Sequence, residues 1–271
     1  MKKFYLSTLS FASLVFMNVA VAANTPTTEP SQVVTQFTTE QVKDIKKIVT
    51  EYIIQHPDVV MLAFQAGMAE KQKEEVAKIE KAVIENKDKI FKSNPAFPTA
   101  GNTKNPTQEL VLFMDPYCGY CKKFHGELGS ILNANKDVRI TFIDVPIMGP
   151  GSFVAIKAML AAKAQNKYDQ LQQAIFSADK HLSKKQILKI AKSLGIDTKQ
   201  LEQDMKSKGI QAQVNRNEAL VKTLGMNGTP TLIIGESKVV PGFLSAEEVN
   251  KLLKETTSSA PGTQPTPKKP S

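Results

Sequence analysis

The chain has 271 residues, a formal net charge of +9 at pH 7 and only two cysteines. Its length allows one large domain or two smaller ones. The lysines are scattered among glutamates along helix-like segments and are not gathered with aromatic residues, so the charge does not indicate a nucleic-acid-binding surface.

The first 22 residues have the pattern of a secretory signal peptide. Two lysines precede an apolar run from Phe4 to Val21, and Ala20-Val21-Ala22 is a small-residue cleavage site. A retained membrane anchor is the alternative, but the run is short for a membrane span and polar residues interrupt it. No cysteine lies near the site to accept a lipid, and no twin arginine is present. We therefore expect an exported protein, cleaved near Ala22, with a mature charge of +7.

A helical region is predicted to follow a disordered leader. Residues 23–36 are rich in threonine, proline and serine, which is typical of disorder. Thr38 or Thr39 can cap a first helix, and His56-Pro57 ends it, because a residue before proline avoids the α region. Asp58 can cap a second helix, which leads into a long segment, 69–91, rich in lysine and glutamate.

The apolar residues of this helical region are too few to form a core of their own. One face of the first helix carries Val42, Ile45, Ile48, Val49, Tyr52 and Ile53. In 69–91 every seventh residue is apolar, but the alternate positions are weak, so a strict coiled coil is not predicted. Such faces need another copy of the chain or the following domain. We interpret 37–92 as an oligomerisation region and stalk, with packing on the chain's own catalytic domain as the alternative.

The remaining chain is predicted to hold one catalytic domain. Residues 93–107 contain three prolines and read as a linker, and 256–271 as a disordered tail. Within 108–255 the order is strand–helix–strand, a helical block, then strand–strand–helix. The strands are expected at 110–114, 138–145, 231–234 and 238–240, the helical block at about 152–224, and the last helix at 246–254, capped by Ser245.

Both cysteines, Cys118 and Cys121, stand in a C-x-x-C motif between a predicted strand and a predicted helix. This arrangement is typical of a thioredoxin-like redox site. The first sulfur lies where unpaired helix N–H groups and the helix macrodipole favour an anion, which stabilises its thiolate. Only a thiolate attacks a disulfide, so this position makes a cysteine reactive.

Other uses of the cysteine pair fit the sequence less well. A structural disulfide across so short a loop would restrict the unfolded chain little. Zinc usually needs four ligands and only His125 is near, so no metal site is expected. Covalent haem attachment needs a histidine where Lys122 stands. No cofactor is therefore expected beyond the redox-active disulfide between Cys118 and Cys121.

Three features of the chain together resemble one known family. They are the motif Phe-Met-Asp-Pro-Tyr-Cys-Gly-Tyr-Cys-Lys-Lys-Phe at 113–124, the later Gly228-Thr229-Pro230-Thr231, and the order of elements. The family that they resemble is the DsbA-like thiol:disulfide oxidoreductases of bacterial periplasms. The resemblance covers about 108–255 and implies an α/β thioredoxin fold with a helical insertion. Residues 38–67, with Gly101-Asn102, look like the subgroup with an N-terminal oligomerisation region. That subgroup includes dimers and trimers, some of them isomerases.

The resemblance implies roles for individual residues. Cys118 would be the exposed nucleophile, Cys121 the buried resolving thiol, Gly119 and Tyr120 the dipeptide between them, and Thr229-Pro230 a cis-proline loop. A cis bond would leave the Thr229 backbone free to pair with an extended peptide substrate. An ordinary turn is the alternative.

Two features depart from the strongly oxidising members of that family. Gly119-Tyr120 is the dipeptide of the periplasmic isomerase DsbC, whereas those members commonly have Pro-His. Without that histidine the disulfide is less oxidising, which favours shuffling. Leu112 stands where relatives often carry a buried acid, so proton transfer would use water or Lys122. His125 is expected on the helix surface, and His181 in a loop.

These expectations combine into an exported, homodimeric, periplasmic thiol:disulfide oxidoreductase that forms or isomerises disulfides. Its partners would be unfolded or misoxidised exported proteins and a membrane redox partner that resets the site, with no nucleic acid. A dedicated reductase is the main enzymatic alternative. The non-enzymatic alternative is a chaperone or a copper-binding dithiol protein.

Overall fold

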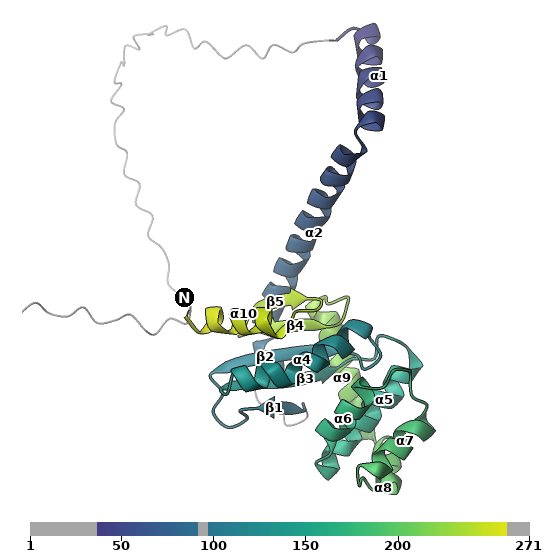
Figure 1. Cartoon of the computed structure of the whole chain (residues 1–271), viewed down its shortest axis with the longest axis vertical. Helices are drawn as coiled ribbons and strands as arrows, with labels where there is room; N and C mark the ends of the chain where they lie inside the picture. The colour runs from purple at the N-terminus through teal and green to yellow at the C-terminus, as the bar shows by residue number, and fades with distance from the viewer. Residues whose placement is uncertain (1–36, 92–96, 259–271) are drawn as a thin grey trace, which may run out of the picture. The chain divides into compact units, whose positions relative to one another are not determined.

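The computed structural model describes residues 37–91 and 97–258 (Figure 1). The predicted signal peptide (1–22), the predicted leader (23–36) and nearly all of the predicted tail lie outside the described residues. The chain divides into two compact units, residues 1–61 and 62–271, and each is described by itself.

The first unit contains helix α1 (Thr39–Gln55) and the start of α2 (Pro57–Glu85). The Thr38 hydroxyl accepts a hydrogen bond from the Gln41 N–H, and the Gln41 side chain accepts one from the Thr38 N–H. This capping box makes Thr38 the cap. Helix α1 ends at His56, as predicted.

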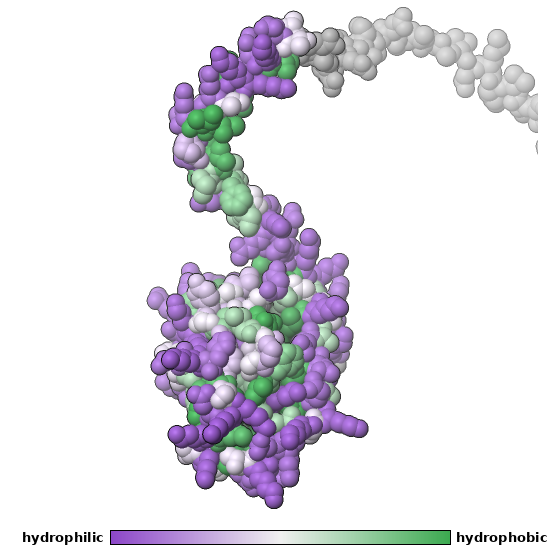
Figure 2. Space-filling model, turned by 90° about the vertical axis from the view of Figure 1, so that its right-hand side faces the viewer, coloured by the Kyte–Doolittle hydropathy of each residue, from purple (hydrophilic) through white to green (hydrophobic). Residues whose placement is uncertain are grey.

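No residue of α1 is buried. Its predicted apolar face is exposed within the described structure, with Val42 the least exposed at 38% and Ile48 the most at 65%. Figure 2 shows hydrophobic side chains on the surface of this helical region. The face therefore has no partner within the described residues of the first unit.

Helix α2 is continuous from Pro57 through the predicted stalk, and α3 (Lys87–Ile90) follows it. The predicted second helix is present, but Asp58 is not its cap, because Pro57 is already the first helical residue and Asp58 lies in the first turn. Proline suits this position, since its fixed φ fits the helix and its missing N–H needs no partner there.

A five-stranded sheet forms the centre of the second unit, with the order β1-β3-β2-β4-β5. Strands β2 and β3 are parallel and all other pairs are antiparallel. The strands are β1 (Thr99–Gly101), β2 (Gln108–Met114), β3 (Val138–Asp144), β4 (Thr231–Ile234) and β5 (Lys238–Pro241). The last four agree with the predicted strands to within two residues.

Strand β1 was not predicted and lies inside the expected linker, 93–107. It is only three residues long and partly exposed, so it has no alternating apolar pattern. It ends at Gly101, where φ is +80° and a Cβ would lie 2.3 Å from the Val138 carbonyl oxygen. The close approach to β3 therefore requires glycine at this position.

Helices cover both faces of this sheet. They are α4 (Gly119–Ala134), α5 (Pro150–Ala162), the 3₁₀ turn η1 (Lys163–Gln165), α6 (Tyr168–Phe176), α7 (Lys184–Ser193), α8 (Thr198–Asp204), α9 (Lys208–Leu224) and α10 (Ala246–Ser258). Helices α4 and α10 pack on one face, with the insertion helices α5–α8 in the same core. The predicted helical block is confirmed, since 152–224 contains no strand.

The other face of the sheet is covered by α9 and by the C-terminal part of α2. Ile79 and Val83 of α2 are buried there beside Phe113 of β2. The Glu80 carboxylate accepts a hydrogen bond of 3.2 Å from the Val239 N–H on the edge strand β5. From about residue 76 onward the stalk thus packs on its own catalytic domain, the alternative left open by the sequence.

This packing predicts a difference between two neighbouring residues. Val83 is fully buried and Ile84 is 53% exposed. Val83→Ala should lower the free energy of unfolding by about 2 kcal/mol, since it leaves a cavity in the core. Ile84→Ala is the matched control and should change it by less than about 0.5 kcal/mol. Urea denaturation measures both, and equal values would mean that α2 is not part of this core.

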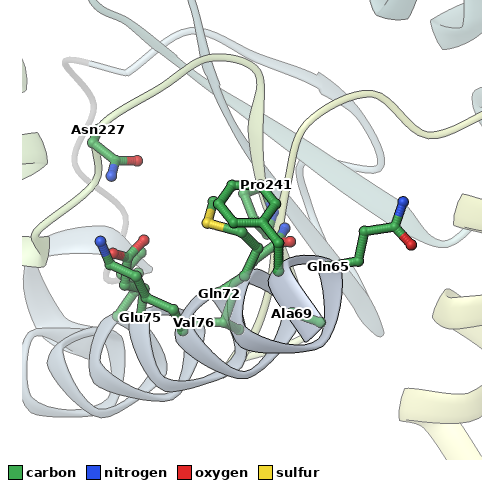
Figure 3. A pocket seen from close by; sticks show the side chains of 11 residues that line it. Gln65, Ala69, Gln72, Glu75, Val76, Asn227 and Pro241 are labelled. Carbon is green, nitrogen blue, oxygen red and sulfur yellow. The ribbon is translucent and has the colours of Figure 1, made fainter. Parts of the chain in front are cut away.

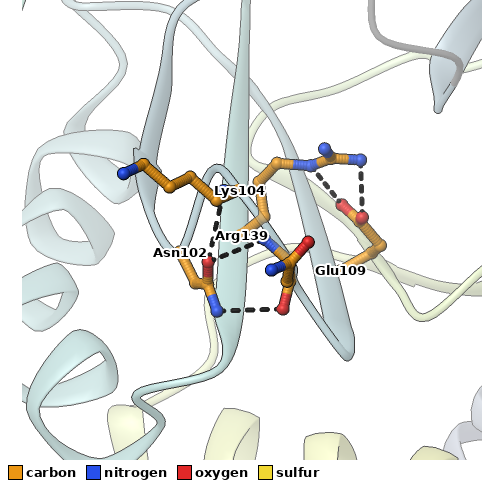
Figure 4. A network of polar contacts seen from close by, with 5 residues as sticks. Asn102, Lys104, Glu109 and Arg139 are labelled. Atoms are coloured by element: carbon orange, nitrogen blue, oxygen red, sulfur yellow. Dashed lines mark hydrogen bonds and ion pairs between the residues drawn. The ribbon is translucent and has the colours of Figure 1, made fainter.

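Polar contacts fix the sheet at the amino end of β2, opposite the cysteine motif (Figure 4). The Arg139 guanidinium of β3 contacts the Glu109 carboxylate of β2 at 3.0 and 2.6 Å. The Asn102 side chain accepts from the N–H groups of Lys104 and Asn105 and donates to the Asn105 carbonyl. Burial raises the pKa of Glu109, and the Arg139 charge partly offsets this effect.

Candidate active site

Cys118 and Cys121 lie where β2 ends and α4 begins. Cys118 is the N-cap residue of the 16-residue helix α4, with an extended backbone, and Cys121 is in its first turn. The Cys118 sulfur therefore stands at the end of the helix where unpaired N–H groups and the macrodipole stabilise a thiolate. Both side chains are free thiols.

The two thiols differ in burial. Both thiols are buried, so the expectation of an exposed Cys118 is wrong: Cys118 is 8% exposed, because the cis-proline loop covers it, and Cys121 is fully buried. Burial raises the pKa of the Cys121 thiol, and contacts with the Thr229 hydroxyl and the Asp115 backbone oppose this rise only in part. Cys121 is therefore protonated at neutral pH, and Cys118 is the more accessible sulfur of the pair.

Selective alkylation of the reduced protein tests this difference. At pH 7.5, iodoacetamide should modify Cys118 and leave Cys121 unmodified in the folded protein, because only the thiolate reacts. Both thiols should react after denaturation. Peptide mapping by mass spectrometry gives the site, and equal modification of both thiols before unfolding would contradict the assignment.

The loop before β4 faces the cysteines. Its Thr229–Pro230 peptide bond is cis. The Thr229 carbonyl oxygen is 3.2 Å from the Cys118 sulfur. The Thr229 hydroxyl is buried beside the weakly hydrogen-bonding Cys121 thiol, and among the described residues it has no regular hydrogen-bond partner. The structure thus brings together all four of Cys118, Cys121, Thr229 and Pro230.

Asp115 holds the turn before the motif, a role that sequence reasoning missed. It is fully buried, and its carboxylate accepts hydrogen bonds from the Tyr117 and Met148 N–H groups and from the Ser152 hydroxyl, at 2.8, 2.9 and 2.8 Å. These bonds connect the turn to the loop after β3 and to the start of α5. The Asp-Pro pair before the motif was the available signal.

A loop of the helical insertion packs against the residues that flank Cys118. The Tyr117 hydroxyl bonds to the Leu182 N–H and carbonyl at 3.0 and 3.1 Å. The ring of His181 stacks on that of Tyr117 at 4.2 Å. The Lys122 ammonium, one of the two proton carriers considered from the sequence, hydrogen-bonds to the Ala178 carbonyl. His181 lies in a loop, as predicted.

A sequence model of the DSBA-like thioredoxin domain matches residues 109–254, more than half of the chain. The chain belongs to this family. The predicted thioredoxin fold with a helical insertion is thereby confirmed. No curated protein sequence matches this DSBA-like chain.

Solved structures of similar proteins agree with the family. The thiol-disulfide exchange protein alpha-DsbA2 of Wolbachia pipientis is 31% identical, covers 67% of this chain and 97% of its own, and has a TM-score of 0.61. A thioredoxin-like oxidoreductase of Silicibacter pomeroyi DSS-3 is also 31% identical, over 64% and 98%, with a TM-score of 0.60. A linker-deletion mutant of Proteus mirabilis ScsC, 22% identical over 83% and 98%, has a TM-score of 0.62 and shows likeness of fold alone.

His125 of this DSBA-like protein is buried, so the prediction that it lies on the helix surface is wrong. It is 7% exposed, its ring stacks on Phe176 of α6 at 4.5 Å, and it hydrogen-bonds to the Gln172 side chain. Burial lowers its pKa, so the imidazole is neutral at pH 7. Helical spacing placed His125 correctly on α4 but contained no information about α6, which covers that face.

A buried acid lies on β3 instead of at Leu112. The Tyr168 hydroxyl donates to the Asp144 carboxylate at 2.8 Å, and the Gln172 amide donates to that hydroxyl at 2.8 Å. A chain of polar side chains thus runs from His125 to Asp144. Burial raises the pKa of Asp144 to about 7. An aspartate at the end of a predicted strand was the signal that sequence reasoning did not use.

Two further features are absent from the described residues: a cluster of metal-ligating side chains and a helix that could span a membrane. Within 37–91 and 97–258, no three His, Cys, Asp or Glu residues gather in a way that could hold a metal ion. None of the helices in the described part of the chain has the length and apolar composition to cross a membrane.

Proposed function

We propose that this DSBA-like protein is a periplasmic thiol:disulfide oxidoreductase that forms and isomerises disulfide bonds in exported proteins, with Cys118 as nucleophile and Cys121 as resolving thiol. The observation that carries the proposal is the Cys118 sulfur at the N-terminus of α4, 3.2 Å from the carbonyl of the cis-proline loop, with Cys121 buried behind it. The signal-peptide pattern of 1–22 supports export.

In the oxidising direction the protein carries the Cys118–Cys121 disulfide. A client thiolate attacks the Cys118 sulfur, and Cys121 leaves and takes up a proton. A second client thiolate then attacks the client sulfur of the mixed disulfide, and Cys118 leaves as a thiolate stabilised by the helix terminus. The client has lost two electrons and the protein has gained them, so a membrane redox partner must reoxidise it.

In the isomerising direction the reduced Cys118 thiolate attacks a wrong client disulfide. The released client thiolate can attack another client disulfide and rearrange the pairing, and a client thiolate then attacks the client sulfur of the mixed disulfide, so that Cys118 leaves as a thiolate. Where this fails, Cys121 attacks the Cys118 sulfur and releases a reduced client. The Gly119-Tyr120 dipeptide supports this direction. Because no histidine between the cysteines stabilises the Cys118 thiolate, the Cys118–Cys121 disulfide is less oxidising, which favours shuffling.

A homodimer formed through the N-terminal region would place two such sites in one molecule. The exposed apolar face of α1 supports this part of the proposal, because an unpartnered face of that kind usually marks an interaction site. Two sites around one cleft would suit isomerase and chaperone work on unfolded chains.

Activity recovery from a scrambled multi-disulfide protein, together with sedimentation velocity, tests the proposal. The wild type should sediment as more than one copy at micromolar concentration and restore activity. Ile45→Asp/Val49→Asp should sediment as a monomer and lose isomerisation while still oxidising a reduced client. Lys47→Asp, on the opposite face of α1, is the control and should behave as wild type. A monomeric wild type would refute the oligomer, and no recovery would refute the isomerase.

A further inference from the structure

Helix α2 lies along the edge strand β5, and its earlier residues are nearer the end of the sheet that carries the cysteines. The Lys87 ammonium contacts the Glu236 carboxylate beside the β4–β5 turn at 2.5 Å. About two helical turns earlier, Glu80 accepts a hydrogen bond from the Val239 N–H. Earlier still, α2 faces Pro241, which pairs with Thr231 at the start of β4, directly after Pro230.

A pocket of about 570 Å³ lies between this part of α2 and the catalytic domain (Figure 3). All its lining residues belong to the second unit. Phe64, Met68 and Val76 of α2 supply apolar surface, and Asn227 and Pro241 contribute from the catalytic domain. Phe64 and Met68 are 63% and 52% exposed, so the apolar surface is open to solvent in the single chain.

The catalytic-domain side of this pocket is directly connected to the cis-proline loop. Asn227 is two residues before Thr229 in the chain. Gly242, which follows Pro241, donates its N–H to the Pro230 carbonyl at 2.8 Å. Because the Thr229 carbonyl touches the Cys118 sulfur, the pocket begins next to the place where a client would be held.

The chemistry of the pocket suits an extended polypeptide. Gln65, Gln72 and Asn227 line it, and none of these amides hydrogen-bonds to another residue in the described parts of the chain. An amide offers both donors and an acceptor, which is what a peptide backbone needs. Lys71 and Glu75 also line the pocket, so neither sign of charge dominates.

We propose that this pocket binds the segment of a client polypeptide that flanks its reacting cysteine, with an apolar side chain on Phe64 and Met68 and the backbone on the free amides. The proposal rests on the proposed function and adds a substrate preference to it. The stalk helix is then part of the substrate-binding surface, and clients with exposed apolar residues near a cysteine, as in unfolded chains, react fastest.

The test compares two peptides, each with one cysteine pair, flanked by leucine in one and by aspartate in the other. For the wild type and for each variant, we measure the rate at which the oxidised full-length protein oxidises each peptide. This rate is divided by the rate at which the same protein oxidises dithiothreitol, which has no flanking chain. The wild type should prefer the leucine peptide about tenfold or more, the scale of one apolar side chain in a pocket. Met68→Asp and Asn227→Asp should each reduce that preference several-fold. Asn133→Asp, an exposed control far along α4, should keep it.

Each other outcome overturns the proposal in a distinguishable way. Equal rates for both peptides, or an unchanged preference in both pocket variants, would show that clients do not use the pocket, while reaction with dithiothreitol would leave the proposed function standing. Loss of oligomers in Asn227→Asp, seen by sedimentation, would show that a second copy of the chain occupies the pocket. No reaction of the wild type with dithiothreitol would remove the proposed function itself.

Discussion

Replacing Cys118 with serine should lower the rate of disulfide exchange by about 10³-fold or more, because it removes the nucleophile that forms the mixed disulfide. The sulfur stands at the N-terminus of α4, where no other thiol can take its place, since Cys121 is fully buried. The measurement is the reduction of a disulfide peptide by a fixed excess of dithiothreitol, with and without the protein.

The control for this variant is Cys121→Ser, which keeps the attacking sulfur. It should still form a mixed disulfide with the substrate, but release of that mixed disulfide should then depend on the dithiothreitol concentration, because the resolving thiol is gone. Substantial turnover by Cys118→Ser would contradict the assignment of Cys118. Suppression of client aggregation that survives in Cys118→Ser would instead show a chaperone activity separate from the redox site.

Asp144→Asn should stabilise the protein at neutral and alkaline pH. The ordinary pKa of the carboxyl is 3.8, and burial raises it to about 7 in the folded protein. Between these values the folded state binds a proton that the unfolded state has lost, so stability falls as the pH rises from about 4 to about 7. Asparagine does not titrate, and its carbonyl can still accept from the Tyr168 hydroxyl.

The free energy of unfolding of Asp144→Asn should therefore exceed that of the wild type by an amount that grows across this pH range and levels off above pH 8. Its upper size is roughly 4 kcal/mol, from the shift in pKa. Urea denaturation at pH 4.5, 6 and 8 measures it, and Asp137→Asn, at an exposed position, is the control. An advantage that is the same at all three values would show that Asp144 does not titrate in the folded protein.

The sequence was informative wherever a local pattern decides the structure. Alternating or apolar runs gave four of the five strands, and capping residues such as Ser183 and Ser245 gave the starts of α7 and α10. The position of the cysteines at the start of α4 followed from a strand pattern before them and a helix pattern after them. These signals lie within a few residues of the feature that they predict.

Contacts between distant segments were not predictable in this way. The burial of His125 depends on α6, some fifty residues later, and that of Ile79 and Val83 depends on a sheet built from β2 onward. Strand β1 exists only because β3 offers it an edge. A single sequence carries no signal for such pairings, because the apolar pattern of a segment does not identify the distant segment against which it packs.

The central claim is that Cys118 is the sulfur through which clients are bound. The most direct measurement is mass-spectrometric mapping of the complex formed when oxidised multi-cysteine client is mixed with reduced Cys121→Ser. The account predicts a stable mixed disulfide on Cys118, released by dithiothreitol. No covalent complex, although Cys118 is shown to be reduced and the protein folded, would contradict it.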